Sequence, residues 1–516
     1  MLRSFGDLNF FTILQNMKGL LLQLCLSAMF LLGISTTTRA GKYYDFSPRA
    51  NNAYQNILSL RLTEARYDLD QMRLFEQDNL IYHYLESYLD FLTVFVNDNK
   101  AEYNRMLAKR DNRLGALAMG DIKSPYNLYT QAEVRLQWAY LQGRYGNYMG
   151  SLSDIKQAYA LLEENQRRFP WFVANKKSLG ILHALVGNVP EDYKWVIRTL
   201  GGMNGTTEQG VRELEEVLQY AKSNSYQFEE ETLICYAMLQ LFLNNQQEKA
   251  WTTLKTSKLN PKYNPLAAYA MATVAMRTGK NDEAIQLLQE MPTGANYAPF
   301  HHRNFLLGVA KLRRLDTDAY KPLQDFLNNF KGSNTIKEAY QKLAWFHLLS
   351  DNPSGYQTYI NYAKLKGADN AEPDQAALRE AKKGEIPDPL LLRARLLFDG
   401  GYYQRAFDLL KNAGGQYQNQ HKLNLEYRYR LGRIAQKLGK SAEAIQYYQQ
   451  TINSGSKDPW YFACNAALQL GQIYEGQKNY TAARLAYKQC LGMQPEEYAT
   501  SLHAQAKSGL QRCEKK

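Results

Sequence analysis

Cysteine is scarce in this sequence, with five residues in a chain of 516. Cys25 lies in the N-terminal stretch, and the others show none of the spacings of a metal site or a CxxC motif: Cys235, Cys464, Cys490 and Cys513. Cys464 and Cys490 are expected at the two ends of one helical hairpin. The sequence allows two alternatives. The two cysteines could form a disulfide in an oxidising compartment, or they could be two separate buried thiols, which is the favoured interpretation.

Recognisable catalytic motifs are also missing. The sequence contains no H-E-x-x-H and no G-x-S-x-G. Its seven histidines are scattered, and the adjacent His301 and His302 would point about 100° apart on a helix, which makes a poor chelate. We therefore predict a protein that is not an enzyme and that needs no metal ion or other cofactor.

Dense runs of Lys and Arg are absent, although the formal net charge is +12. This spread of charge argues against the concentrated basic footprint of a nucleic-acid-binding protein, so no nucleic-acid partner is predicted. It is compatible with an acidic partner and with association at an anionic membrane surface. After the first 40 residues, no apolar run reaches the ~20 residues that a membrane-spanning helix needs.

The first 40 residues contain the one long apolar run, Gly19 to Ile34, preceded by Lys18. Thr38-Arg39-Ala40 then supplies a small-x-small cleavage site, which completes the three-part pattern of a secretory signal peptide. We predict that translation starts at Met17, that cleavage follows Ala40, and that the protein is exported to the periplasm or cell envelope. An uncleaved membrane anchor is the alternative.

The clearest pattern in the remaining chain runs from residue 425 to residue 495 and reads as two copies of one helical hairpin. Ala444 lies 13 residues after Leu431, and Ala483 lies 13 residues after Leu470. Each of these leucines is followed by glycine. Small side chains at such positions let two antiparallel helices approach closely.

This pattern resembles the tetratricopeptide repeat (TPR), a helix-turn-helix of about 34 residues with a W-x2-L-G-x2-Y…A-x3-F…P signature. Further back, Ala250 and Ala284 are separated by the same 34 residues. The resemblance, of the exported bacterial type, implies an all-α protein. Its expected fold is an α-solenoid in which stacked TPR-like hairpins form a right-handed superhelix, because each hairpin leaves an apolar face that its neighbour must cover.

Departures from the repeat pattern suggest how the chain is divided. One is a Gly-rich run before a helix for which Thr207 is the expected N-cap. The predicted parts are a signal peptide (1–40), a diverged TPR-like region (41–225) with a loop insertion near 187–207, a central TPR array (226–366), a linker or hinge (367–386), and a C-terminal TPR array with a capping helix (387–516).

The resemblance also implies where a partner would bind, since the first helices of stacked hairpins line a concave groove. In the repeat that starts at residue 425, Tyr429, Arg433 and Lys437 are four residues apart and share one helix face. Equivalent places in other copies give further candidates: Arg395 and Phe398, then Asn465, Gln472 and Glu475, and further back Tyr269, Thr273 and Arg277. The alternative is a solvated, charged helix face without a ligand.

Basic and aromatic side chains together suit an extended acidic peptide or a peptide C-terminal carboxylate. In chaperone-binding TPRs the carboxylate clamp resembles a Lys/Asn/Lys set, and here Tyr429 and Tyr269 replace the first Lys. We predict a scaffold that binds a protein or peptide partner, an acidic one being favoured, in the cell envelope. The alternative is a binding protein for a glycan or lipid in a groove rich in Tyr and Trp. The oligomeric state, and whether the arrays form one superhelix or two lobes, stay open.

Overall fold

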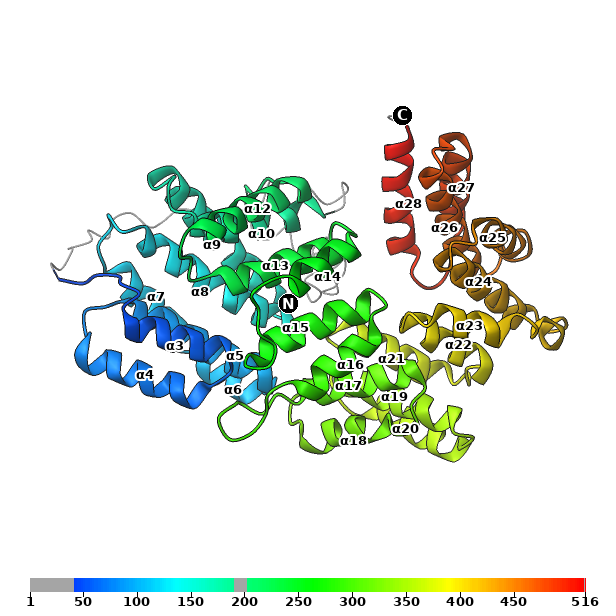
Figure 1. Cartoon of the computed structure of the whole chain (residues 1–516), viewed down its shortest axis with the longest axis horizontal. Helices are drawn as coiled ribbons and strands as arrows, with labels where there is room; N and C mark the ends of the chain where they lie inside the picture. Colours follow the sequence, from blue (N-terminus) through cyan, green and yellow to red (C-terminus); the bar gives the residue numbers. More distant parts are fainter. Residues whose placement is uncertain (1–40, 190–201, 515) are drawn as a thin grey trace, which may run out of the picture.

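The computed structural model describes residues 41–189, 202–514 and 516. The predicted signal peptide and most of the loop insertion lie outside these residues. The described chain is a string of helical hairpins, and its one extended pairing is an isolated bridge between Tyr43 and Asn79. The predicted all-α solenoid of stacked hairpins is therefore confirmed (Figure 1).

The N-terminal helices occupy one end of the molecule, and pairs such as α8 and α9 pack side by side (Figure 1). Their bounds are α3 (Pro48–Leu58), α4 (Leu62–Phe75), α5 (Ile81–Asn97), α6 (Lys100–Leu107), α7 (Arg110–Ala118), α8 (Pro125–Arg144), α9 (Tyr148–Arg168), α10 (Ala174–Gly187) and α12 (Thr207–Ser223).

The central helices continue the stack as consecutive hairpins. Their bounds are α13 (Glu229–Phe242), α14 (Gln247–Lys255), α15 (Pro265–Arg277), α16 (Asn281–Glu290), α17 (His302–Arg314), α18 (Tyr320–Asn329), α19 (Ile336–Leu349), α20 (Pro353–Leu365) and α21 (Glu372–Lys383).

The C-terminal helices form the opposite end, where α28 packs against α26 and α27 (Figure 1). Their bounds are α22 (Pro389–Asp399), α23 (Tyr403–Leu410), the short 3-10 helix η2 (Gly414–Tyr417), α24 (His421–Lys437), α25 (Ser441–Gly455), α26 (Phe462–Gly476), α27 (Tyr480–Gly492) and α28 (Ala499–Glu514).

Several helices begin with a local signal that is visible in the sequence. Proline occupies the first helical position, and the preceding polar side chain accepts a hydrogen bond from a backbone N–H of the first turn. The capping residues are Ser47, Ser124, Asn264, Asn352 and Asp388. Helix α12 begins one residue differently from the prediction. Thr207 is its first helical residue, and the Thr206 hydroxyl accepts from the Gln209 N–H, so Thr206 is the N-cap.

The stretch 367–386, expected as a linker or hinge, contains α21. Glu380 on this helix accepts hydrogen bonds from Trp345 Nε1 at 2.7 Å and from Gln341 Nε2 at 2.6 Å, both on α19. Helix α21 therefore packs onto the central array. The C-terminal array also contacts α16 directly, because Asn281 Nδ2 donates to the Tyr402 hydroxyl at 3.2 Å. The proposed domain boundaries stay predictions.

The expected closeness of Cys464 and Cys490 is seen in the structure. Both side chains are buried, their Sγ atoms are 3.5 Å apart, and both are free thiols. Cys464 lies on α26 and Cys490 on α27, so the pair sits inside the interface of one hairpin.

Glycines of the repeat signature create slots for tyrosine rings. A Cβ atom on Gly471 would lie 2.5 Å from Cε1 of Tyr487, and Gly509 on α28 lies against the same ring. Gly432 faces Tyr448 in the same way one repeat earlier. Both tyrosine rings are fully buried, so the missing Cβ atoms are what allow the helices to close around them.

We predict that Gly471→Ala destabilises the C-terminal array, because the new methyl group must displace the Tyr487 ring. The expected loss is about 1–3 kcal/mol in unfolding free energy. Gly476→Ala is the matched control, since it lies on the same helix and a Cβ atom there would meet no other atom within 4 Å. There alanine should leave stability unchanged or raise it by up to ~1 kcal/mol. Hydrogen exchange of peptides from α26 and α27 measures the stability of both variants. Equal protection in the two variants would show that the Tyr487 ring does not require a glycine at position 471.

Candidate functional site

A groove of about 330 Å³ lies between α22, α24, the start of α26 and α28, and we call it the C-terminal groove. Its basic and acidic lining residues are Arg395, Arg430, Arg433 and Asp399. Three guanidinium groups thus face one carboxylate. Aromatic rings make up much of the remaining wall: Phe398, Tyr429, Tyr461 and Tyr498.

Arg433 is held in place by neutral groups. Its Nη1 donates to the Tyr429 hydroxyl at 2.9 Å, and its guanidinium lies 5.0 Å from the centre of the Phe398 ring. Asn465 Nδ2 donates to the same hydroxyl at 2.8 Å. No ion pair joins Arg433 to a carboxylate of the described residues. Its guanidinium is therefore oriented by neutral groups, and the nearby charge of Asp399 favours it without forming an ion pair.

The other two guanidinium groups differ in how far they are neutralised. Arg430 forms a close ion pair with Glu426 on the same helix. Arg395 lies 3.9 Å from Asp399, which is at the limit of an ion pair, and stacks 5.0 Å from the ring centre of Trp345. The lining therefore keeps an excess of positive charge beside aromatic faces, which suits an acidic group.

Five of the eleven candidates named from the sequence line one groove in the structure. Arg395, Phe398, Tyr429 and Arg433 all line the C-terminal groove, as does Asn465. Tyr429 is almost fully buried, with 4% of its surface exposed, so it supports Arg433 more than it faces solvent.

The remaining candidates lie elsewhere. Lys437 is exposed at the end of α24, and Gln472 is half-buried on α26, both outside the groove lining. Arg277 stacks over Phe242, with 5.9 Å between the guanidinium carbon and the ring centre. Tyr269 and Thr273 line a different hollow, between the N-terminal helices and the central array.

Sequence reasoning missed Tyr461 and Tyr498 in the groove. Each immediately precedes the first residue of a helix, α26 and α28 respectively, and the two rings contact each other at 5.1 Å between their centres. An aromatic residue directly before each of the alternate helices α26 and α28 was the available signal. It was missed because only residues inside the first helices were considered.

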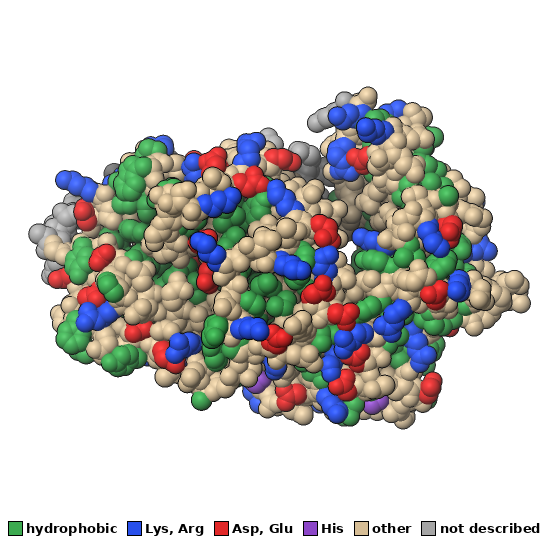
Figure 2. Space-filling view, viewed as in Figure 1, with side chains coloured by type: hydrophobic (Ala, Val, Ile, Leu, Met, Phe, Trp, Pro, Cys, Tyr) green, Lys and Arg blue, Asp and Glu red, His purple; other side chains and the backbone are tan. Residues whose placement is uncertain are grey.

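The surface, the side-chain clusters and the helices each add one finding. On the face shown in Figure 2, Lys and Arg are interspersed with Asp and Glu, without one basic patch. Among residues 41–189, 202–514 and 516, no three His, Cys, Asp or Glu side chains are grouped so that they could hold a metal ion. Within the same ranges, none of the helices has the length and apolar character needed to cross a membrane.

Comparison with known proteins agrees with this class of fold. Residues 425–453 and 465–497 match the tetratricopeptide repeat family. The protein is thus an α-solenoid whose C-terminal array contains two tetratricopeptide repeats. A comparison with curated proteins gives no match.

Solved structures similar to the chain are distant ones. A monomeric IFIT1 mutant with Gppp-AAAA has a TM-score of 0.37 and 14% identity, covering 80% of this chain and 91% of that one. The human IFIT1 dimer with m7Gppp-AAAA has a TM-score of 0.30 and 14% identity, covering 92% of this chain and 91% of that one. The P58(IPK) TPR domain has a TM-score of 0.21 and 15% identity, covering 80% of this chain and 95% of that one. Similarity at this level says nothing of a partner.

One buried carboxylate, at Asp98, ties the end of α5 to α8 and to the loop before α19. It accepts hydrogen bonds from Arg144 Nε at 2.8 Å, from the Asn334 N–H at 2.8 Å and from the Ser333 N–H at 3.2 Å. We call this group of four residues the Asp98 clamp. Burial alone would raise the pKa of the Asp98 carboxyl, but Arg144 and Asn334 outweigh it and hold that pKa below its usual value.

We predict that Asp98→Ala loosens the start of α19, because Arg144 and two backbone N–H groups lose their acceptor. Removing one partner of a buried pair costs about 3–5 kcal/mol. Because the pKa of Asp98 is lower in the folded chain than in the unfolded one, its contribution is present above about pH 4 and is lost as the pH falls below that value. Hydrogen exchange of the Ser333 and Asn334 amides should therefore accelerate in the variant at pH 7.

Asp111→Ala is the matched control, since Asp111 is exposed and pairs only with the neighbouring Arg110. Its effect should stay within about 0.5 kcal/mol. Equal protection of the Ser333 and Asn334 amides in both variants would show that the clamp does not hold this loop.

Proposed function

We propose that the protein is a non-enzymatic scaffold that binds an acidic segment of a protein partner in the C-terminal groove, and that it works in the cell envelope after export. The observation that carries the proposal is Arg433. Its guanidinium is fixed by Tyr429 and Phe398, faces the groove, and has no carboxylate partner among the described residues.

A carboxylate from a partner would complete this arrangement. Arg presents parallel N–H donors that match the two oxygens of a carboxylate, and such charge-assisted hydrogen bonds are about twice as strong as neutral ones. Phe398 and Tyr429 already restrict the side chain, so less rotamer entropy is lost when the partner binds. Tyr461 and Tyr498 at the groove wall supply large, rigid faces for apolar side chains that flank the acidic residue.

A peptide fits this groove better than a glycan does. Glycan sites depend on aromatic platforms and hydrogen bonds, whereas three Arg side chains against one Asp favour an anionic ligand. The tetratricopeptide repeats at residues 425–453 and 465–497 support a role in holding a protein partner. The binding should therefore weaken as salt screens the charges.

We predict that Arg433→Glu weakens binding of an acidic peptide at least about tenfold, because attraction becomes repulsion at the groove. The probe is a fluorescent hexapeptide of alternating Glu and Leu, titrated against the protein from Gly41 onward. The same peptide with Gln in place of Glu should bind weakly to both proteins. Raising the salt from 0.1 M to 1 M shortens the screening length from about 10 Å to about 3 Å and should reduce the affinity of the unmodified protein.

Arg428→Glu is the matched control, because it changes the same charge on the same helix outside the groove lining. It should change the affinity by no more than about twofold. If both variants lose the same affinity for the peptide, the effect comes from the change in net charge alone, and the proposed binding site in the groove is rejected. Salt-independent binding of the peptide would also count against it.

The export proposal has its own test. The apolar run from Gly19 to Ile34 and the Thr38-Arg39-Ala40 site predict that the mature protein begins at Gly41. Mass spectrometry of the N-terminal peptide, after fractionation of cells that make the whole chain, should find Gly41 in the soluble envelope fraction. An intact leader in the membrane fraction would favour the anchor, and an intact leader in the cytoplasm would reject export.

A further inference from the structure

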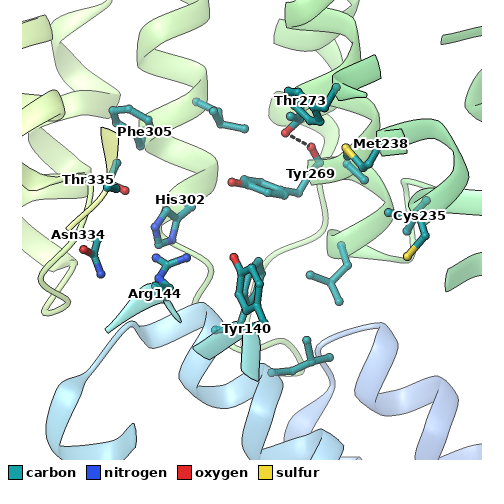
Figure 3. A pocket seen from close by; sticks show the side chains of 18 of the residues that line it. Tyr140, Arg144, Cys235, Met238, Tyr269, Thr273, His302, Phe305, Asn334 and Thr335 are labelled. Atoms are coloured by element: carbon teal, nitrogen blue, oxygen red, sulfur yellow. Dashed lines mark hydrogen bonds between the residues drawn. The ribbon is translucent and has the colours of Figure 1, made fainter. Parts of the chain in front are cut away.

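A second hollow, of about 290 Å³, lies between α5 and α8 on one side and α13, α15 and α17 on the other (Figure 3). We call it the central cavity. Its wall is mainly apolar and aromatic, with residues such as Leu92, Phe95, Met238, Phe242 and Phe305. Small-molecule sites typically measure about 300–1,000 Å³, and a dry apolar cavity of about 150 Å³ holds benzene. The central cavity therefore has room for a molecule of about two aromatic rings.

Polar groups gather at one end of this cavity. Figure 3 shows the His302 ring and the Arg144 guanidinium close together, with the hydroxyls of Tyr140 and Tyr269 directed toward the same space. Tyr140 and Arg144 both lie on α8, whereas Tyr269 and His302 lie on α15 and α17 of the central array. The Asp98 clamp ties α8 to the loop before α19 of that array. The opposite end carries Met238 and Cys235.

His302 is the unusual member of this set. Its side chain is 93% buried, since 7% of the residue is exposed, yet neither ring nitrogen has a hydrogen-bond partner in the described chain. The ring packs against phenylalanines on its other sides, with Phe330 at 4.8 Å and Phe326 at 5.7 Å between ring centres. Burying such a group unpaired costs free energy, so the position is poorly explained by folding alone.

The charge of the wall limits what can bind there. Every charged side chain that lines the cavity already has a polar or charged partner: Arg144 with Asp98, Glu230 with Asn264, Glu231 with Lys177, and Glu338 with Lys342. Burial and the nearby Arg144 charge lower the pKa of His302 to about 3, so its ring is neutral at pH 7. A charged ligand would have to compete with these pairs, whereas a neutral hydrogen-bonding group would not.

We propose that the central cavity binds a small, uncharged, largely apolar molecule whose single hydroxyl or amide group pairs with His302. A neutral imidazole carries one N–H donor and one acceptor nitrogen, and a hydroxyl or an amide can serve either. The apolar body of the molecule lies among Leu92, Met238 and Phe305. This site is separate from the C-terminal groove, and the proposal does not depend on what that groove binds.

The experiment uses three probes of one size: naphthalene, 2-naphthol and 2-naphthoate. Each is titrated against the mature protein by fluorescence or calorimetry. We expect 2-naphthol to bind more tightly than naphthalene by between about twofold and tenfold, which is the effect of one hydrogen bond. 2-Naphthoate should bind most weakly, because Arg144 already pairs with Asp98. No binding of 2-naphthol up to 1 mM, or tightest binding of 2-naphthoate, would overturn the proposal.

His302→Leu tests the polar end. The variant should bind naphthalene as well as the unmodified protein does, and it should lose the preference for 2-naphthol. Without ligand its melting temperature should be equal or higher, since an unpaired buried polar group is removed. His301→Leu is the matched control, because the adjacent histidine does not line the cavity, and it should keep the preference. If the preference survives in His302→Leu, the assignment of His302 is wrong.

Thr273→Phe tests the location. Thr273 lies on α15 at the cavity wall, so the larger ring should fill the space and abolish binding of both naphthalene and 2-naphthol (Figure 3). Far-UV circular dichroism and the melting temperature establish that the variant is folded. Unchanged binding by the folded variant would place the probes elsewhere and reject the cavity. If this variant does not fold, the comparison of the two histidine variants still decides the proposal.

Discussion

The carboxylate of Asp98 joins parts of the array that lie far apart in the sequence. It lies at the C-terminal end of α5, is fully buried, and holds the backbone of Asn334, which is 236 residues away in sequence. A solenoid whose repeats touch only their neighbours has no such long-range tie. Here the tie draws the N-terminal helices against the central array, and the space enclosed between them becomes the central cavity.

The start of α19 is where three parts of the chain meet. Its first N–H groups have no partners within the helix, and the helix dipole makes them attractive to carboxylates. Asp374 on α21 accepts from the N–H groups of Thr335 and Glu338 at 2.7 and 3.0 Å, so it does the capping that a local side chain usually does. Asp98 accepts from the N–H groups of Ser333 and Asn334 and thereby holds the loop that leads into the helix. The N-terminal region and α21 are therefore positioned through the same helix end.

These facts explain how far the sequence could predict the molecule. The Leu-Gly and Ala spacing is a local signal, and it predicted the hairpins, the close packing at Gly471 and five residues of the C-terminal groove. Tyr429 shows the limit of that reasoning, since its helix face was right but its ring is buried beneath Arg433. The central cavity could not be predicted, because Asp98 and Asn334 belong to no common motif. His302 was weighed only as a metal ligand, and nothing near it in sequence signals that its ring lacks a partner.

The two hollows differ in what they leave unsatisfied. Around the central cavity each charged group of the wall has a partner, and the buried polar atoms left without one are neutral: the ring nitrogens of His302 and Oδ1 of Asn334. In the C-terminal groove, the cation of Arg433 is held by a phenol and an aromatic face, and the nearby charge of Asp399 favours it without forming an ion pair. Because desolvating an unpaired ion is costly, a carboxylate that completes the pairing of Arg433 gains more than one that must displace an existing partner in the central cavity. The groove is therefore the hollow suited to an anionic group, and the central cavity the one suited to a neutral group.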